Sequence, residues 1–407
     1  MIDDAHAEWL ARAGDDLIDF GRGATLSSGG FGWLDSRGRV DPTKPLHTYL
    51  NARMTHVFAL AAIRGRPGTQ ELAAHGVAAL SGLLHDDVHG GWFAAVAPDG
   101  TPVDPSKTAY EHAFVVLAAA SAAAAEVEGA RRLLTDALDV VDDRFWDAGV
   151  GRCVDGYDRT LAVLEDYRGA NANMHMVEAF LAAGDVLADS ALYQRALGIA
   201  EFLIHEVAAG HDGRLPEHFS RSWEPLLDYN AERADDPFRP YGWTPGHSLE
   251  WARLLLGVET ALGTHAPDWL VPAARQLVDV AVHHGWATDG APGFVYTVDW
   301  HDRPVVRTRM HWVAAEAVAA AAVLNRRTGE DRYARWYREW WDQIRRSFID
   351  PVNGGWHHEL EPSGALSATV WSGKPDIYHA YQATAIPVLP DSASVVGGVL
   401  TEAAARH

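Results

Sequence analysis

The sequence predicts an all-α fold, an (α/α)6 barrel or toroid, in which six helical hairpins close into one ring with short β-hairpins in the long loops at one end. A Gly-Gly-Trp turn followed by a histidine-bearing helix start recurs along the chain. The helix-opening histidines return at intervals of 56 to 72 residues, and apolar, often alanine-rich segments alternate with charged ones. Because these repeats fill nearly the whole chain, we expect a single domain over residues 1–407.

The repeat is clearest in "DDVHGGWFAAVAPDGTPVDPSKTAYEHAFVVLAAA" (86–120) and "DPVNGGWHHELEPSGALSATVWSGKPDIYHAYQA" (350–383). Each has an Asp-rich turn, Gly-Gly-Trp, an alternation about a glycine turn that is typical of a hairpin, a lysine, and then Tyr and His at the start of an apolar helix. Weaker copies lie in 145–180 and 291–323. The histidines that open the six helices are His56, His112, His175, His247, His311 and His379.

Two series of helices follow from this pattern. Six inner helices begin at the histidine-bearing turns, and the small alanine side chains in several of them permit close packing in an inner ring. Six outer helices carry more charge, as in "DRYARWYREWWDQIRRSF", which is typical of a helix with one wet face. We expect inner helices near 45–64, 106–124, 168–187, 245–261, 308–328 and 373–388, outer helices near 69–84, 127–144, 189–208, 266–284, 329–347 and 391–406, and an extra helix near 4–20 outside the ring.

The connections between these helices predict where function lies. Connections from an inner to an outer helix are short and turn-like, whereas those from an outer to an inner helix are long and contain the hairpins. All long loops and all helix-opening histidines therefore lie at one end of the predicted barrel. Loops on a rigid scaffold are where functional residues usually gather.

Composition excludes several classes of partner. A formal net charge of -21 argues against nucleic acid or an anionic membrane surface. The longest apolar run, near "AFVVLAAASAAAA", is too short to cross a bilayer. The single cysteine, Cys153, excludes a disulfide within the chain, and the acidic "MIDDAHAEWL" lacks the layout of a secretory signal. We therefore expect a cytoplasmic protein with no nucleic-acid or membrane partner.

The residue types point to acid–base chemistry on a sugar. The chain has 21 histidines, which titrate near neutrality, and 16 tryptophans, whose flat faces suit sugar rings. Lysine occurs only at Lys44, Lys107 and Lys374, which weakens any Schiff-base mechanism. Phosphate loops and dinucleotide fingerprints are absent from the sequence, so we expect no cofactor.

Pairs of residues at helix starts give the candidate site. In "YGWTPGHSLEWARLLL", His247 and Glu250 are three residues apart on one helix face, so the carboxylate can orient the imidazole. His175 and Glu178 repeat this spacing, although a solvated helix pair is an open alternative there. Arg53 lies in an apolar helix start, where a charge needs a partner or an anionic ligand.

The roles of two asparagines and of three helix-opening histidines remain open, as does the question of a bound metal. Asn171 and Asn173 in "GANANMH" offer amides suited to sugar hydroxyls. Two of the opening histidines, His56 and His112, could instead be wall residues, and His311 could be structural. The H-x-x-E pairs stand on different helices without a second short-range ligand pair, so we favour metal-free chemistry over a metal site.

Five motifs resemble the N-acylglucosamine 2-epimerase superfamily: "NARMTHVFAL", "KTAYEHAFVVLAAA", "RGANANMHMVEA", "PGHSLEWARLLL" and "WSGKPDIYHAYQA". They cover the six repeats in the right order. The chain looks most like the aldose–ketose isomerase branch, which includes D-mannose isomerase and sulfoquinovose isomerase. The resemblance implies a barrel with its active site at the hairpin-lined mouth and a monosaccharide substrate.

The resemblance also implies roles for individual residues. His247 and His379 would be the general acid–base pair, with Glu250 supporting His247. Arg53 and His175 would hold the oxygens at C1 and C2 of the sugar. Tyr110 and Asn171 would bind hydroxyls, while Trp312 and Trp371 would form aromatic walls.

The implied reaction is an aldose–ketose isomerisation through a cis-enediolate, which forms after the sugar ring opens. Proton return to C1 gives the ketose, whereas return to C2 from the opposite face gives the epimer. D-Mannose and D-fructose are the expected pair, with D-lyxose and D-xylulose as a second. The residue types leave open which histidine shuttles the proton, and whether the chain is a monomer or a homodimer.

Four alternatives stay open at this point. Within the family, the chain could be a 2-epimerase of mannose or glucose, or a sulfoquinovose isomerase, although nothing marks an extra cationic pocket for a sulfonate. A glycoside hydrolase would need two carboxylates, for which Glu250 and Asp376 are the candidates. A non-enzymatic helical-repeat scaffold would make no special use of histidine.

Overall fold

A computed structural model describes residues 2–406 of the chain. The chain divides into two compact units. Unit 1 comprises Met1–Leu17, Ala200–Lys374 and His379–Asp391, and unit 2 comprises Ile18–Ile199, Pro375–Tyr378 and Ser392–His407. That residues 1–407 form one catalytic domain stays a prediction.

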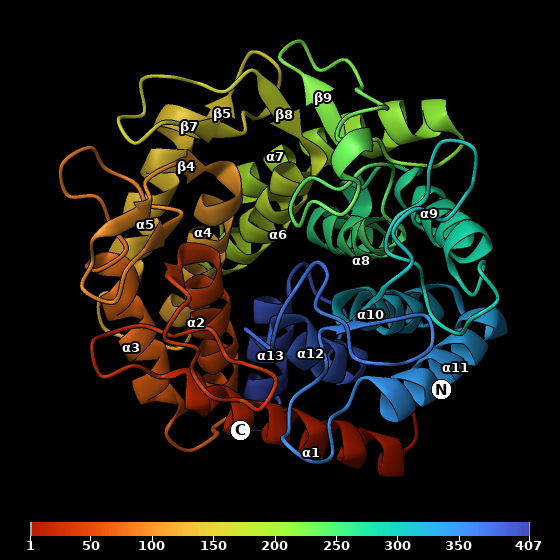
Figure 1. Cartoon of the computed structure of the whole chain (residues 1–407), viewed down its shortest axis with the longest axis horizontal. Helices are drawn as coiled ribbons and strands as arrows, with labels where there is room; N and C mark the ends of the chain where they lie inside the picture. Colours follow the sequence, from red (N-terminus) through yellow and green to blue (C-terminus); the bar gives the residue numbers. More distant parts are fainter. Residues whose placement is uncertain (1, 407) are drawn as a thin grey trace. The chain divides into compact units, whose positions relative to one another are not determined.

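Unit 2 contains three consecutive helical hairpins (Figure 1). Their first helices α2, α4 and α6 pack side by side and are buried along almost their whole length, because alanine and other small or apolar residues leave no polar face. At Gly76 of α3 a Cβ atom would lie 1.9 Å from Oγ1 of Thr55 in α2, so this hairpin needs glycine to close. The helices are α2 (Thr48–Ile63), α3 (Thr69–Ser81), α4 (Ala109–Ala124), α5 (Ala130–Val140), α6 (Ala170–Leu187), α7 (Ser190–Ala200) and, packed on α2, α4 and α6, α13 (Val395–Ala404).

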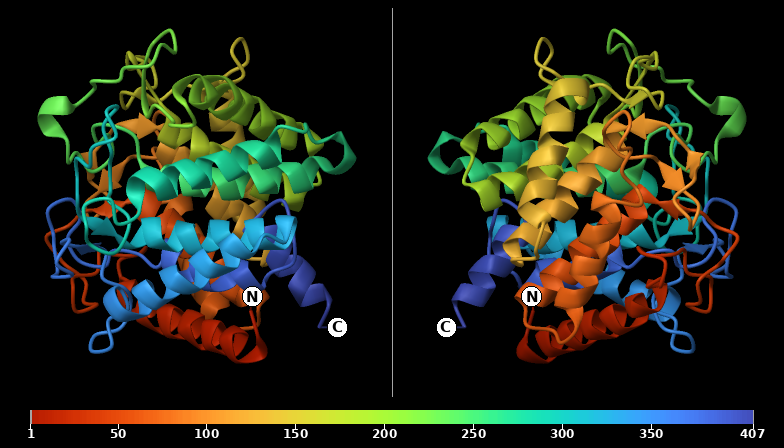
Figure 2. Two further views of the ribbon diagram at one scale, coloured as in Figure 1. Left: turned by 90° about the vertical axis from the view of Figure 1, so that its right-hand side faces the viewer. Right: turned by 90° about the vertical axis from the view of Figure 1, so that its left-hand side faces the viewer.

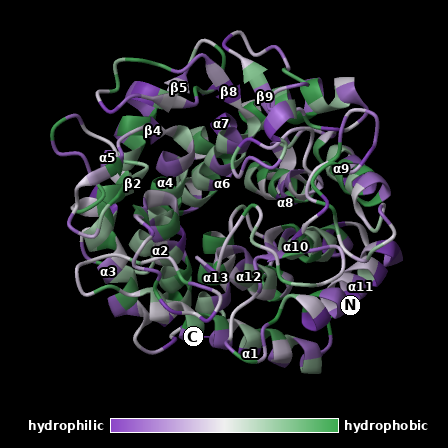
Figure 3. Cartoon of the chain, viewed as in Figure 1, coloured by the Kyte–Doolittle hydropathy of each residue, from purple (hydrophilic) through white to green (hydrophobic). Residues whose placement is uncertain are grey.

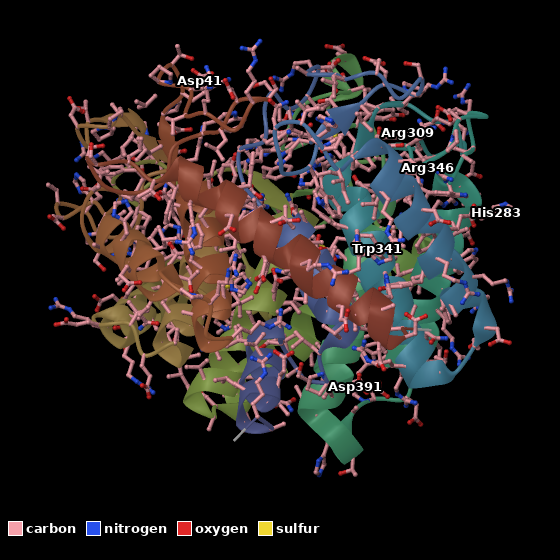
Figure 4. The ribbon with its side chains drawn as sticks, turned by 90° about the horizontal axis from the view of Figure 1, so that it is seen from below. Asp41, His283, Arg309, Trp341, Arg346 and Asp391 are labelled. Atoms are coloured by element: carbon pink, nitrogen blue, oxygen red, sulfur yellow. The ribbon has the colours of Figure 1, made fainter. Side chains whose placement is uncertain are left out.

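Unit 1 repeats the same alternation. Helices α8 and α10 pack on each other, and each also packs on the helix that follows it. The first part of α1 lies on α11, where the Trp9 and Trp341 rings meet edge to face at 5.2 Å and Arg345 covers Trp9 at 3.9 Å (Figure 4). The helices are α1 (Asp4–Gly21), α8 (Pro245–Leu262), α9 (Leu270–Gly285), α10 (His311–Thr328), α11 (Asp331–Ser347) and α12 (Tyr378–Ala385).

The outer helices are amphipathic, as expected. Helix α11 is largely hydrophilic in Figure 3, yet Tyr337, Trp340 and Trp341 on one face of it are buried. Across the part of the chain that the structure describes, no helix combines the length and apolarity that a bilayer crossing requires.

Short strands lead into the inner helices. β1, β4, β8 and β10 end directly before α2, α4, α6 and α10, so the long loops of each unit lie at the N-terminal ends of its inner helices (Figure 2). Five strand pairs within the units are antiparallel: β1 with β2, β2 with β3, β4 with β7, β5 with β6, and β10 with β11. The strands are β1 (Leu46–His47), β2 (Ala95–Val96), β3 (Pro102–Asp104), β4 (Lys107–Thr108), β5 (Trp146–Asp147), β6 (Arg152–Cys153), β7 (Gly156–Tyr157), β8 (Tyr167–Gly169), β9 (His218–Ser220), β10 (Arg309–Met310) and β11 (Glu359–Leu360).

The helix boundaries differ from the sequence prediction in several ways, including the following three. The inner helices other than α8 begin a few residues later than predicted, mostly because the leading residues form strands. The helix predicted over 373–388 is only Tyr378–Ala385, because Pro375 precedes it and a 3-10 turn containing Pro387 follows it. The helix predicted over 189–208 ends at Ala200 and continues as a π-helix over Glu201–Ala208.

Candidate active site

Three inner-helix starts of unit 1 bring together what we call the histidine cluster: His247, Trp312, His379, Glu217 and Glu316. His247 is the third residue of α8, Trp312 the second of α10 and His379 the second of α12. Thr244 precedes α8 and Pro245 is its first residue, a position that proline favours because its fixed φ already suits a helix.

One indole contacts both of the predicted acid–base residues. The Trp312 ring centroid lies 5.1 Å from that of His247 and 5.8 Å from that of His379. The two imidazoles are therefore no farther apart than the sum of these distances, which one open-chain hexose can span. Gly246 makes the arrangement possible, because a Cβ atom there would lie 2.5 Å from the Trp312 ring.

Each of these imidazoles is held by a buried carboxylate. Nδ1 of His247 donates to Oε1 of Glu217 at 2.8 Å, and Nδ1 of His379 donates to Oε1 of Glu316 at 3.0 Å. Both glutamates are buried. A carboxylate on Nδ1 fixes the tautomer and strengthens the other nitrogen as a base, so Nε2 of each ring is the reactive atom.

Glu250 has a different partner from the one that the sequence predicts. The sequence predicts that it supports His247, but the structure assigns that hydrogen bond to Glu217. Glu250 instead lies 3.5 Å from Arg253, whose Nε donates to Oε2 of Glu316 at 3.0 Å. Two carboxylates so close in a buried setting repel each other, and the guanidinium offsets this by pairing with both.

The same residues form a possible metal-ligand set. Ligand atoms of Glu250, Glu316 and His379 lie within 4.8 Å of one another. Their carboxylate and imidazole donors would suit a divalent ion. Because Arg253 already supplies the positive charge that Glu250 and Glu316 need, we keep the metal-free prediction for this site.

A second aromatic layer flanks the histidine cluster. The rings of His311 and His358 stack at 3.7 Å, and His311 meets His379 edge to face at 6.3 Å. His311 therefore packs against the neighbouring His358 ring and carbonyl, which agrees with the structural role that its sequence position left open. Trp371, predicted as an aromatic wall, meets Phe238 edge to face at 5.2 Å.

Unit 2 holds a second group of predicted residues, which we call the arginine cluster: Arg53, Tyr110, Asp376, His175 and Glu178. Arg53 donates to the Tyr110 hydroxyl at 2.8 Å and to Oδ2 of Asp376 at 3.3 Å. Burial opposes its charge, but the neighbouring Tyr110 and Asp376 oxygens raise the pKa of Arg53 above its usual value. Its Nε is buried and bonds to none of the described residues, so the donor is available for a ligand.

His175 stands beside this arginine. Its ring meets Tyr110 edge to face at 5.3 Å, and its Nδ1 lies 3.6 Å from Oε2 of Glu178, which confirms the predicted pair. The hydroxyl of Tyr378 donates to the same carboxylate.

The two asparagines of "GANANMH" have different roles. Oδ1 of Asn171 is buried and makes no hydrogen bond to a described residue, as expected of a group that binds a sugar hydroxyl. Asn173 bonds to the backbone of Cys153 and Gly169 through 2.8, 3.0 and 3.1 Å contacts. The interpretation of Asn173 as a hydroxyl ligand is therefore wrong, because its amide is fully used in the fold.

Two opening histidines are structural. Nδ1 of His56 donates to the Ser121 hydroxyl at 2.6 Å, which joins α2 to α4. His112 donates from Nδ1 to the Thr108 carbonyl at 2.7 Å and accepts at Nε2 from the Trp92 amide at 3.3 Å. Burial lowers the pKa of His112 to about 3, so the ring stays neutral.

Sequence reasoning missed Glu217 and Glu316. Glu217 lies 30 residues before His247, and no periodicity relates the two. Glu316 had a usable signal, since it is a lone acid four residues after Trp312 on the alanine-rich "HWVAAEAVAAAA" helix. A charge in such a buried helix needs a partner.

Comparison with known proteins identifies the family. A family model described as N-acylglucosamine 2-epimerase (GlcNAc 2-epimerase) matches residues 29–383. The chain belongs to the N-acylglucosamine 2-epimerase family. It is 52% identical over 398 residues to a D-mannose isomerase of Thermobifida fusca, and the match covers 98% of each chain.

Solved structures agree with this assignment. A crystal structure of D-mannose isomerase matches with a TM-score of 0.87 at 26% identity, over 97% of this chain and 98% of the other. The cellobiose 2-epimerase of Spirochaeta thermophila matches with a TM-score of 0.81 at 22% identity, over 98% and 97%. These likenesses confirm the predicted fold class, an all-α (α/α)6 barrel, and the family relatives confirm that the chain is an isomerase.

Proposed function

We propose that this protein is an aldose–ketose isomerase that interconverts D-mannose and D-fructose. The proposal rests on two imidazoles, those of His247 and His379, which both contact the Trp312 ring. Nδ1 of each imidazole is held by a buried carboxylate. This pairing leaves two reactive Nε2 atoms, as an acid and a base acting on one substrate require. The D-mannose isomerases among its relatives support the choice of sugar.

The proposed reaction begins with ring opening: His247 protonates the ring oxygen as the C1–O5 bond breaks, and the anomeric hydroxyl loses its proton to solvent, which leaves an aldehyde at C1. The His379 Nε2 atom then removes the C2 proton, the C–H electrons form the C1–C2 double bond, and the carbonyl electrons move to O1 to give a cis-enediolate. The proton on Nε2 exchanges with solvent and is delivered to C1 while the O2 proton passes to O1, which gives D-fructose. Arg53 and His175 hold the oxygens at C1 and C2 in this proposal, and the buried Nε–H of Arg53 can donate a hydrogen bond to the oxygen on which negative charge develops.

The charges of the two clusters favour an uncharged sugar. Arg53 is paired with Asp376, and Arg253 is paired with Glu316 and Glu250. Each buried guanidinium is therefore already neutralised, and a phosphate or sulfonate would gain little from either. We accordingly keep D-mannose, with D-lyxose as a second aldose, in preference to sulfoquinovose.

The single cysteine is the basis for the cellular compartment that we propose. Cys153 is buried, and burial raises the pKa of its thiol, so it is poorly reactive. A chain with one buried thiol and no possible internal disulfide suits a reducing compartment, so we propose a cytoplasmic enzyme.

Isomerisation in D2O tests the proposed function. Incubation of the protein with D-mannose and EDTA should give D-fructose that carries deuterium at C1, as followed by NMR. Glucose deuterated at C2 would instead establish a 2-epimerase, and activity lost with EDTA would establish a metal enzyme. The variants His247→Asn and His379→Asn should each lower kcat by about 10²-fold or more, since acid–base groups contribute about that much.

A further inference from the structure

Tyr378 takes no part in the proposed proton transfers, yet its side chain contacts the arginine cluster in two ways. It ends the Pro375–Tyr378 segment of unit 2 and is fully buried. A buried tyrosine hydroxyl needs a polar partner, because a hydroxyl without one is costly to remove from water. The ring of Tyr378 serves one member of the cluster and its hydroxyl serves another.

The Tyr378 ring lies against the guanidinium of Arg53. The Cζ atom of Arg53 is 5.0 Å from the Tyr378 ring centroid and 4.4 Å from that of Phe114. These two rings meet edge to face at 5.6 Å and 88°, and the rings of Tyr49 and Tyr110 lie 5.2 and 5.9 Å from the same atom. A buried cation is attracted to the faces of such rings. The aromatic cage therefore holds the guanidinium in one orientation.

The backbone of Tyr378 orients the ionic partner of this arginine. Its N–H donates to Oδ1 of Asp376 at 3.0 Å, and Oδ2 of the same carboxylate accepts from Nη1 of Arg53 at 3.3 Å. Substitution of the Tyr378 side chain keeps this backbone N–H. Variants at this position therefore test the ring and the hydroxyl alone.

The Tyr378 hydroxyl reaches His175 through Glu178. It donates to Oε2 of Glu178, and Nδ1 of His175 lies 3.6 Å from the same oxygen. Glu178 and His175 are both buried and lie one turn apart on α6. A carboxylate that a second donor fixes in place can hold an imidazole in one orientation. The hydroxyl of Tyr378 is this second donor.

We propose that Tyr378 is a positioning residue for both groups that hold the sugar oxygens. Its ring orients Arg53, and its hydroxyl orients His175 through Glu178. This inference rests on the proposed function, in which Arg53 and His175 hold the oxygens at C1 and C2. It adds that one side chain sets both groups, and that substitution can separate the action of the ring from that of the hydroxyl.

Tyr378→Phe removes the hydroxyl and keeps the ring over Arg53. We expect KM for D-mannose to rise by about 10-fold or more, as the loss of a hydrogen bond to a charged group predicts. The value of kcat should stay within about 3-fold of the wild type, because a group that binds substrate and transition state alike affects KM alone. A merely structural residue would act differently, since partial unfolding lowers the amount of active enzyme and leaves KM unchanged.

Tyr378→Leu removes the ring as well. Arg53 then loses one wall of its aromatic cage, so its Nε–H should be misaligned with the oxygen on which charge develops. We expect kcat to fall by about 10-fold relative to Tyr378→Phe. Tyr378→Met takes its place if thermal unfolding shows that the leucine variant does not fold. An unchanged kcat in the folded variant would overturn the role of the ring.

A double-mutant cycle tests the path through Glu178. Glu178→Gln should raise KM about as much as Tyr378→Phe does, and the double variant should add less than about 2-fold, because both changes remove the same link. Tyr193→Phe is the matched control. The Tyr193 hydroxyl also donates to a carboxylate of α6, that of Asp185 at 2.7 Å, about two turns along the helix from Glu178. Its KM and kcat should equal those of the wild type.

The outcomes separate the two hypotheses. An unchanged KM in folded Tyr378→Phe, or KM increases that multiply in the double variant, would overturn the role of the hydroxyl and leave the proposed function standing. If Tyr378→Phe does not fold, Glu178→Gln decides, and an unchanged KM there has the same consequence. A wild type that yields no ketose from any aldose would overturn the proposed function and the positioning role with it.

Discussion

Glu217 and Glu316 give the two histidines of this enzyme the same chemical environment. Each carboxylate is buried and binds Nδ1 of one imidazole, yet the two glutamates come from unrelated places in the chain. The short loop before β9 carries Glu217, whereas Glu316 lies on α10. The proton-transfer capacity of each ring is thus set by a neighbour that its own helix does not supply.

Glu217→Gln should lower kcat/KM for D-mannose by roughly 10- to 100-fold, the usual range for a residue that orients a reactive imidazole. Steady-state rates with D-mannose measure the loss. Glu224→Gln, an exposed glutamate of the same region, is the control, and an unchanged kcat/KM in Glu217→Gln would contradict the assigned role.

At the scale of secondary-structure elements, the N-terminal ends of the inner helices position the site residues. Gly246 lets α8 approach the Trp312 ring of α10, and β10 leads directly into α10. Two buried lysines fix the loops before α4 and α12 in the same way: Lys107 binds Asp86 at 3.1 Å, and Lys374 binds Asp350 at 2.6 Å. Each also donates to the carbonyl of the first glycine of the Gly-Gly-Trp turn.

Gly246→Ala should reduce activity more than stability. The added Cβ would overlap the indole and the Val313 side chain, and such overpacking typically costs about 1–3 kcal/mol. Because Trp312 must then shift between the two imidazoles, we expect kcat to fall by about 10-fold or more, as a displacement of about 1 Å can cause. Gly210→Ala is the control, since no atom lies near the corresponding Cβ position. Equal kcat in both variants would contradict this account.

Lys374→Met should destabilise the protein by about 3–5 kcal/mol, because the buried Asp350 carboxylate would lose its partner. The Lys374 side chain and the Asp350 carboxyl are both almost fully buried, and although burial opposes ionisation, the bond to Lys374 holds the pKa of Asp350 below its usual range. Chemical denaturation measures the loss. Lys44→Met, at a partly exposed lysine over Trp33, should change the unfolding free energy by less than about 1 kcal/mol.

At the scale of the whole molecule, buried histidines control the response to acid. Burial lowers the pKa of six of the described histidines, to about 4 for His47 and about 3 for His112. Their neutral forms are stabilised in the folded state. This contribution is complete above the ordinary histidine pKa of about 6.5 and is lost as the pH falls below it.

The melting temperature should therefore fall between pH 6.5 and pH 4. Glu111 opposes the trend, because burial raises its pKa to about 7 and protonation favours the folded form there, but one carboxyl is outweighed by several imidazoles. His112→Gln keeps a donor and an acceptor and should lower the slope of melting temperature against pH. Calorimetry from pH 7.5 to 4 measures it, and a slope identical to the wild type would contradict the role of His112.

Local patterning was enough to predict the helices, and together with the family resemblance it selected the candidate site residues. Helix-start motifs and apolar periodicity identify α8, α10 and the residues His247, His379, Arg53 and His175, because helical geometry repeats at short range. The strands that precede the inner helices were absorbed into the predicted helices. Two or three residues of strand carry too little pattern to be separated from a helix start.

The partners of those residues depended on long-range packing. His247 bonds to Glu217, which lies 30 residues away in the chain, and not to the nearby Glu250, which instead pairs with Arg253. Asn171 and Asn173 differ for the same reason: one amide is consumed by backbone groups of a distant turn and the other is not. Helix periodicity places a residue on a face, but the identity of its neighbour across that face depends on how separate helices and loops pack.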